Sequence, residues 1–99
     1  MPKIIFEINY NIHPEKREQY LNLINDLRKS IKDTSGNNYS VFENKKLKNN
    51  FTEMYICEND EEFDSLEDNQ SEETIELTQK IYNDLIKDQK VNYTTKYEV

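Results

Sequence analysis

Two glutamates on predicted neighbouring strands are the side chains in this chain best suited to chemistry. Glu7 and Glu53 each lie in a run where apolar and polar residues alternate. A carboxylate enclosed beside an apolar surface has a raised pKa and can act as a general base near neutral pH. We expect Glu7 and Asn9 to share one face of the sheet with Glu53 of the adjacent strand. Tyr55 is expected on that face too, and Lys96 of the last strand is expected to pair with a carboxylate there.

These five side chains are our candidates for lining a ligand pocket, but they also have a structural interpretation. Polar pairs across neighbouring strands are common at a hydrated interface, and perturbed carboxylates serve structure as well as catalysis. A shift of one residue in strand register would also send each side chain to the opposite face. Both interpretations remain open from the sequence.

The other reactive side chains predict no metal site and no bound cofactor. His13, the only histidine, precedes a proline at a predicted helix start, where it is expected to cap the turn or face solvent. Cys57 is the only cysteine, so a thiolate zinc cluster is excluded, and the thiol is expected to be inert. The nine acidic residues between positions 58 and 73 lack the glycine of a calcium-binding loop. They are expected to form a solvated helix start.

Two further groups of side chains are expected to serve solubility and packing. Three lysines, Lys45, Lys46 and Lys48, predict a soluble loop tip; the alternative is that they hold an anionic ligand or the acidic segment of a partner subunit. Tyr93 and Tyr97 on the last predicted strand are expected to pack in the core or at an interface.

Size and charge limit the classes of protein that the chain can belong to. With 99 residues and 12.0 kDa, we expect residues 1–99 to form a single domain. The net charge of −7 argues against nucleic acid and anionic membranes as partners. No apolar run approaches the roughly 20 residues of a membrane span. Because no signal-peptide pattern is found either, a cytoplasmic location is expected.

Hydrophobic periodicity predicts alternating strands and helices. Strands are predicted at residues 3–10, 39–43, 51–58 and 91–99. Helical segments are predicted at residues 14–32, from 59 to a break at 67–70, and at 71–88. The order strand, helix, strand, strand, helix, strand predicts an α+β ferredoxin-like sandwich, in which two helices cover one face of a four-stranded antiparallel sheet. The predicted strand order is four, one, three, two.

The two strands predicted to be central are apolar on both faces. Residues 4–6 and 54–57 are continuous apolar runs, whereas the last strand has one apolar face. Two helices can cover only one side of such a sheet, so another element must cover the second side. We expect a second copy of the chain, which makes a homodimer through the sheet face.

This layout resembles the dimeric α/β-barrel superfamily, and within it the antibiotic-biosynthesis monooxygenase group most. The resemblance covers all 99 residues and rests locally on the acidic helix start at 59–63, the broken second helix and the aromatic last strand. It implies a face-to-face homodimer, a pocket between sheet and helices, and chemistry without an added cofactor. The haem-degrading branch would need Asn9 together with a tryptophan and a histidine. This chain carries Leu66 and Glu76 at those two positions, so haem is not expected.

The resemblance implies an enzyme that acts on a small aromatic or lactone-like molecule, as a cofactor-independent monooxygenase or an isomerase. Glu7 or Glu53 would be the base, with Asn9 and Tyr55 orienting the substrate. The alternative is a non-catalytic ligand-binding or regulatory module that dimerises through the same face, because no strong nucleophile, metal cluster or phosphate loop is evident.

Overall fold

The computed structural model describes residues 2–34, 36–66, 68 and 70–99. The strands are β1 (Ile4–Ile12), β2 (Asn38–Glu43), β3 (Asn50–Cys57) and β4 (Ile86–Tyr97). The helices are α1 (Arg17–Thr34), α2 (Asp60–Asp64) and α3 (Glu72–Asp84), with a 3-10 turn at Pro14–Lys16 before α1. None of the described helices is both long enough and apolar enough to cross a membrane.

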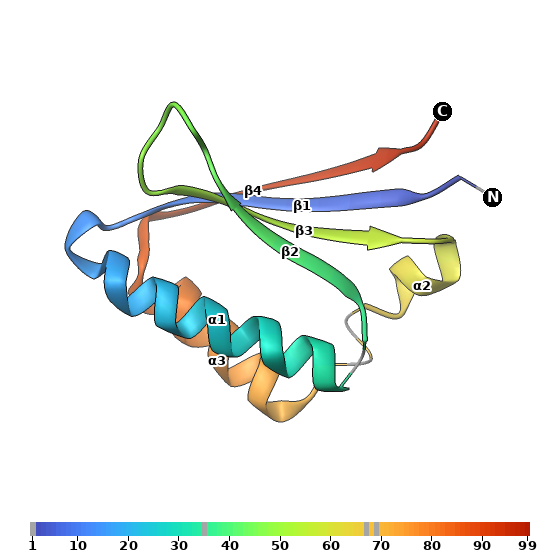
Figure 1. Ribbon diagram of the computed structural model, residues 1–99, viewed down its shortest axis with the longest axis horizontal. Helices are drawn as coiled ribbons and strands as arrows, with labels where there is room; N and C mark the ends of the chain where they lie inside the picture. Colours follow the sequence, from blue (N-terminus) through green and yellow to red (C-terminus); the bar gives the residue numbers. More distant parts are fainter. Residues whose placement is uncertain (1, 35, 67, 69) are drawn as a thin grey trace.

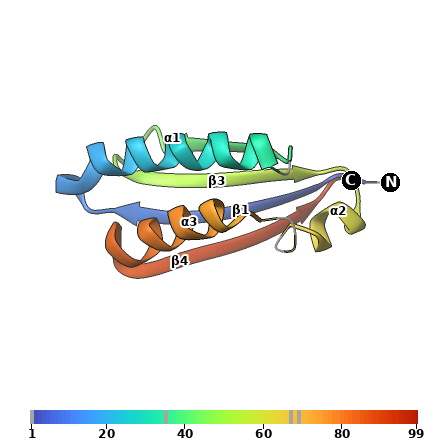
Figure 2. The ribbon, with the colours of Figure 1, turned by 90° about the horizontal axis from the view of Figure 1, so that it is seen from below.

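The four strands form one antiparallel sheet in the order β2-β3-β1-β4, as the sequence predicts. Helices α1 and α3 lie on the same side of this sheet (Figure 1). Seen from below, α1 runs over the β3 side and α3 over the β4 side (Figure 2). The ferredoxin-like α+β fold expected from the sequence is therefore confirmed. The face of the sheet that carries α1 and α3 is called the inner face below, and the opposite face is called the outer face.

The core lies between the inner face and the two helices, and polar groups hold the helix ends. Ser71 caps α3 by accepting a hydrogen bond from the Thr74 backbone N–H at 3.1 Å, and Asn59 caps α2 in the same way. The hydroxyls of Ser30 in α1 and Thr74 in α3 are 2.7 Å apart, and both residues are buried. This hydrogen bond links α1 to α3 above the sheet.

The boundary between the last helix and the last strand differs from the prediction. Helix α3 ends at Asp84 rather than near residue 88, and β4 begins at Ile86 rather than at 91. The reason is that Leu85 and Ile86 are both buried in the core, where Ile86 pairs with Ile12 of β1. Lys16 also donates to the Asp84 carbonyl oxygen at 2.6 Å. The predicted break at 67–70 falls partly on residues 67 and 69, which lie outside the described residues.

The register of β1 against β3 corrects the predicted placement of Glu53 and Tyr55. Ile8 pairs with Glu53 and Phe6 pairs with Tyr55, so both β3 side chains point to the inner face. The prediction that they share a face with Glu7 is wrong by one residue of register. Its physical cause is that β3 is apolar on both faces, so the alternation of the sequence does not say which face the helices cover.

The outer face is only partly shielded in the single chain. Ile5, Met54 and Ile56 lie on it half-buried, and Phe42 of β2 is 55% exposed. The hairpin between β2 and β3 projects beyond the sheet on the side away from the helices (Figure 1).

Candidate functional site

Glu53 is a buried carboxylate enclosed by tyrosine hydroxyls on the inner face. The residue is 2% exposed. Tyr39 donates to Oε1 at 2.6 Å, while Tyr10 and Tyr82 donate to Oε2 at 2.7 and 3.3 Å. The Tyr20 hydroxyl lies 2.8 Å from that of Tyr10 and extends the chain of hydroxyls to α1. We call Glu53 and these four tyrosines the tyrosine–glutamate cluster.

Two opposing effects act on the pKa of the Glu53 carboxyl. Desolvation disfavours the charged form, and the three hydroxyl donors favour it. Desolvation is the larger effect, so burial raises the pKa of Glu53 above its usual range. Burial and the neighbouring carboxylate raise the pKa of Tyr10 and Tyr39 as well, so both hydroxyls keep their protons and donate. The cluster thus places a carboxyl with a raised pKa among hydroxyl donors.

The four tyrosines of the cluster come from four different elements, at positions that the local pattern directs inward. Tyr10 lies on β1 beside the β3 strand that carries Glu53, and Tyr39 lies on β2 at its other side. Tyr20 and Tyr82 lie on α1 and α3 within the apolar stripes that these helices turn to the sheet. Three of these elements, β1, β2 and α3, bring a hydroxyl directly to the Glu53 carboxylate, and α1 reaches it through Tyr10.

A cavity of about 410 Å³ opens beside Glu53 between the sheet, α3 and the segment after α2. Four aromatic rings line it, those of Phe6, Tyr55, Tyr82 and Tyr93. Gln70 and Thr78 add polar groups, and none of the described lining residues is a lysine, arginine or histidine. The Tyr93 ring, whose residue is 61% exposed, stacks on Phe6 with centroids 6.0 Å apart. This arrangement suits a small, neutral, flat molecule whose polar end reaches Glu53.

The structure separates the five predicted pocket residues into two groups. Glu53 and Tyr55 line the cavity on the inner face. Glu7, Asn9 and Lys96 do not line it and lie on the outer face. Lys96 Nζ is 2.8 Å from Glu7 Oε1, so the predicted pairing of Lys96 with a carboxylate occurs there.

Asn9 belongs to a small network of amides on the outer face. Its side-chain nitrogen donates to Asn50 Oδ1 at 2.9 Å and to the Thr52 hydroxyl at 2.9 Å. Asn50 in turn donates to Asn11 Oδ1 at 3.0 Å. These contacts tie β1 to β3 at the hairpin end and give Asn9 no route to the cavity.

The remaining reactive side chains lie apart from the cavity. His13 is half-exposed, with Nδ1 3.9 Å from Glu15 Oε1, and its side chain does not cap the turn that follows. Cys57 is buried, and its burial raises the pKa of the thiol. Over the part of the chain that the structure describes, no group of three or more His, Cys, Asp or Glu side chains could hold a metal ion.

Sequence reasoning missed Tyr10, Tyr39 and Tyr82 as partners of Glu53, although a signal existed. Tyr10 continues the apolar alternation of residues 4, 6 and 8, and Tyr82 lies at helical spacing from the apolar residue at position 75, so each hydroxyl needs a buried partner. Glu53 is the acidic residue that interrupts the otherwise apolar inner face of β3. Matching buried donors to that one acceptor would have indicated the inner face.

The whole chain superposes on known structures of one fold. A conserved protein from Methanosarcina mazei Go1 matches with a TM-score of 0.82 and 16% identity, over 100% of this chain and 95% of that chain. A putative antibiotic biosynthesis monooxygenase from Nitrosomonas europaea matches with a TM-score of 0.77 and 7% identity, over 98% and 90%. A dabb family protein with a ferredoxin-like fold from Mesorhizobium loti MAFF303099 matches with a TM-score of 0.73 and 9% identity, over 100% and 99%.

Comparison by sequence adds nothing to this, because no protein-family model and no curated protein matches the chain. At identities this low the structural likeness defines the fold. The chain has the ferredoxin-like fold that it shares with antibiotic biosynthesis monooxygenase-like proteins, and the resemblance expected from the sequence is confirmed at that level.

Proposed function

We propose that this chain is an enzyme that removes a proton from a small, neutral aromatic substrate, with Glu53 as the base. One observation carries the proposal: a buried carboxyl with a raised pKa lines a cavity walled by aromatic rings. A base whose pKa approaches the working pH combines a useful charged fraction with a strong affinity for the proton. Tyr55 and Thr78 line the same cavity and would orient the substrate.

The cavity supports a neutral aromatic substrate over an anionic or extended one. Its volume of about 410 Å³ falls in the range of sites that enclose small molecules. Faces of Phe6 and Tyr93 would stack on a flat ring, as they already stack on each other. An anionic substrate would meet the Glu53 carboxylate with no cation in the described lining to balance it.

The contact from Tyr82 is the one that a substrate would replace. Its 3.3 Å distance to Oε2 is the longest of the three, and Tyr82 itself lines the cavity. A substrate C–H or O–H that takes this place would give its proton to Oε2. Tyr10 and Tyr39 would keep their shorter contacts and hold the carboxylate in position.

Dioxygen is the co-substrate that the structural likeness to antibiotic biosynthesis monooxygenase-like proteins favours. In that chemistry the carbanion left by proton removal is electron-rich enough to reduce O₂ directly. A ring CH₂ group becomes a carbonyl, one oxygen atom of O₂ enters the product, and the other leaves as water with the two hydrogens. The balance needs no electron donor other than the substrate.

Anthrone, a tricyclic ketone with an acidic CH₂ group, is the probe for this reaction. We expect the protein to accelerate oxygen uptake by anthrone, and Glu53→Gln to lower the rate about 100-fold or more. Glu7→Gln is the matched control, because it makes the same change of charge on the outer face and should leave the rate within about twofold. Equal losses in the two variants would contradict Glu53 as the base.

The second candidate is a ligand-binding module without catalysis. It is favoured by the observation that both Glu53 oxygens already accept hydrogen bonds within the chain. In this case 2-naphthol would bind in the cavity and quench tyrosine fluorescence, while anthrone oxidation would stay at the rate measured without protein. Binding that persists in Glu53→Gln would complete the case for the module.

A homodimer through the outer face is part of the proposal. The half-buried Ile5, Met54 and Ile56 form an apolar strip that a second copy would cover. Native mass spectrometry should then give about 24 kDa, twice the 12.0 kDa chain. Met54→Lys should return the monomer mass. Leu21→Lys, at an exposed apolar position on α1, is the control that should leave the dimer intact.

A further inference from the structure

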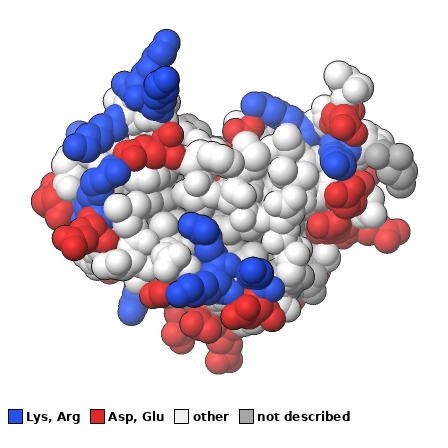
Figure 3. All heavy atoms as spheres, in the orientation of Figure 1, with Lys and Arg blue, Asp and Glu red and all other residues white. Residues whose placement is uncertain are grey.

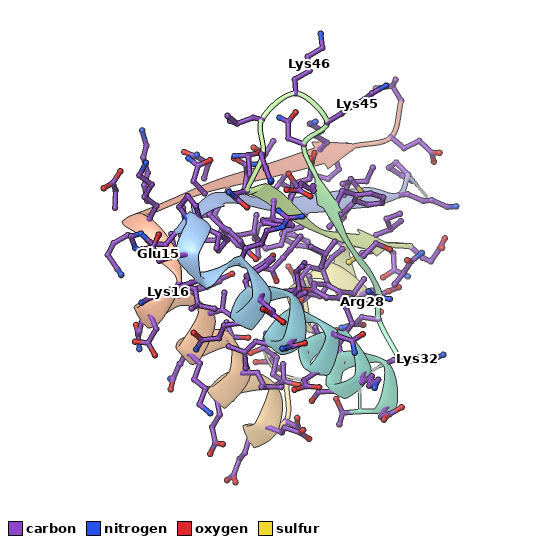
Figure 4. All side chains as sticks on the ribbon, turned by 60° about the vertical axis from the view of Figure 1, so that its left-hand side comes forward. Glu15, Lys16, Arg28, Lys32, Lys45 and Lys46 are labelled. Atoms are coloured by element: carbon purple, nitrogen blue, oxygen red, sulfur yellow. The ribbon has the colours of Figure 1, made fainter. Side chains whose placement is uncertain are left out.

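A second cavity, separate from the one beside Glu53, lies between α1 and the start of β2. Its volume is about 480 Å³. Three cationic side chains, Arg28, Lys29 and Lys32, line it from the helix side, together with the amide of Asn25. Asn37 and Asn38 line it from the strand side. Figure 4 shows Arg28 and Lys32 beside β2, far from Lys45 and Lys46 at the tip of the hairpin.

The lining of this cavity is positively charged, although the chain as a whole is negatively charged. The net charge is −7, yet none of the described lining residues is acidic. Figure 3 shows blue atoms gathered over the C-terminal half of α1, with red atoms below them. By contrast, the cavity beside the hairpin contains a carboxylate: Arg17 there is joined to Glu43. Within the described residues no ion pair joins Arg28 or Lys32 to a carboxylate.

Helical spacing and one glycine build the cavity. Arg28 and Lys32 are four residues apart, so they lie one turn above the other on the same side of α1, and Asn25 continues this row. Gly36 has a φ of +65° and donates its N–H to the Ile31 carbonyl oxygen, which ends the helix and turns the chain back along α1. No atom lies within 4 Å of the place a Gly36 Cβ would occupy, so the turn leaves open space.

The end of the helix does not account for all of these cations. A lysine in the last turn, such as Lys32, offsets the partial negative charge of the free carbonyls there. Arg28 lies six positions before the helix end at Thr34, which is beyond the last turn. Arg28 is exposed and free to meet a ligand, and the carboxamides around it supply further N–H donors.

We propose that this α1–β2 cavity binds the phosphate group of a small phosphorylated molecule. Arg28 would take two phosphate oxygens with its planar fork of N–H groups, and Lys32 would take the third oxygen as a point charge. The amides of Asn25, Asn37 and Asn38 would complete the shell of donors. With Lys29, three cationic side chains line the cavity, which suits the dianion that a phosphate monoester carries at neutral pH.

Tyr39 gives this cavity a structural connection to Glu53. The residue lines the α1–β2 cavity, and its hydroxyl donates to Glu53 Oε1 at 2.6 Å. A ligand that shifts Tyr39 would therefore be sensed by the carboxylate. The phosphate site itself does not depend on the function proposed for Glu53, because its binding is measured without turnover.

The test is a titration of the ¹⁵N-labelled protein with inorganic phosphate, with ionic strength held constant by NaCl. We expect saturable shifts of the backbone amides of Asn25, Arg28, Lys32 and Asn37. The double variant Arg28→Gln/Lys32→Gln should raise the apparent Kd about tenfold or more, since it removes two of the charged donors. Lys45→Gln/Lys46→Gln makes the same change of charge at exposed lysines and should change the Kd less than about twofold. The spectra also report whether each variant is folded.

Three results would overturn the proposal. Shifts that do not saturate, or that weaken equally in both double variants, would mean general attraction of anions to lysines. Acetate that binds at this cavity as tightly as phosphate would contradict the assignment of a phosphate group and indicate a carboxylate ligand instead.

Discussion

Glu53 and Glu7 are the same residue type on adjacent strands, yet they occupy opposite environments. Glu7 pairs in register with Met54, the residue next to Glu53, so one step along the strand separates the two faces. Glu53 is 2% exposed and accepts hydrogen bonds from three tyrosine hydroxyls. The Glu7 side chain is 21% exposed and pairs with a lysine that is itself 61% exposed.

The difference shows that the covering layer, and not the strand itself, decides what a carboxylate can do. On the inner face the helices exclude water, so the Glu53 pKa rises and hydroxyl donors are needed to offset the desolvation. On the outer face of the single chain, water remains close to Glu7, and a lysine partner adds little. A general base is therefore expected where helices cover the sheet.

The largest effect that should separate the two glutamates is on stability. Glu53→Ala leaves three buried hydroxyls without their acceptor, at about 1 to 3 kcal/mol each before they rearrange. We expect a loss of about 3 to 5 kcal/mol in the free energy of unfolding, measured by urea denaturation. Glu7→Ala should cost less than about 1 kcal/mol, because it removes one exposed ion pair. Similar losses in the two variants would show that the two faces are equally covered.

The fold could be predicted from the sequence because its signals are periodic and redundant. The apolar residues Tyr20, Leu23, Ile24, Leu27 and Ile31 recur at helical spacing on α1, and all of them are buried except Leu23, which is half-buried. The continuous apolar runs of β1 and β3 correctly marked these strands as central. Each such pattern is repeated over many residues, so no single position decides the outcome.

The site could be predicted only in part, because its geometry depends on the strand register and the helix end at individual residues. Glu53 and Tyr55 were identified as pocket residues, but their face depended on a register that two apolar faces leave undetermined. The end of α3 depended on whether Leu85 continues the helix or turns into the core. Contacts such as Tyr39 to Glu53 join residues on separate strands, and a periodic pattern along the chain does not encode them.

The tyrosine donors provide the next test of the comparison. Tyr39 donates at 2.6 Å and Tyr82 at 3.3 Å, so the two contacts differ in strength on the same carboxylate. Tyr39→Phe should lower the free energy of unfolding by about 1.5 to 3 kcal/mol, as for a hydrogen bond to a charged group. Tyr82→Phe should cost less than about 1 kcal/mol. A reversed order would mean that Tyr82, on the cavity side, is the principal donor.

The raised pKa of Glu53 should make the free energy of unfolding fall as pH rises. Its folded-state pKa lies above the usual value of 4.5, so the folded chain holds the proton more tightly than the unfolded chain. Stability should therefore fall as pH rises from 4.5 through the folded pKa, by up to about 1.4 kcal/mol per pH unit. Glu53→Gln should remove this slope in urea denaturation between about pH 4.5 and 8.

If the free energy of unfolding of the wild type rose relative to that of Glu53→Gln between pH 4.5 and 8, the raised pKa would be contradicted.

Glu43 affects the pH dependence of stability in the opposite direction and over a different pH range. The Arg17 guanidinium and the Asn49 backbone N–H lower the pKa of Glu43 to about 2. Its contribution is present above pH 4.5 and is lost as pH falls toward 2, so the two carboxyls do not overlap.

The smallest expected effect is the coupling between Glu7 and Lys96, and it also tests what covers the outer face. In the single chain, at dilutions where native mass spectrometry gives 12.0 kDa, a double-mutant cycle with Glu7→Gln and Lys96→Gln should give less than about 1 kcal/mol and fall as salt is raised, as for an exposed pair. At concentrations where the 24 kDa dimer forms, a coupling above about 2 kcal/mol that resists salt would mean that water is excluded from the pair. The outer face would then resemble the inner one, with a second copy of the chain in the role that α1 and α3 play for Glu53.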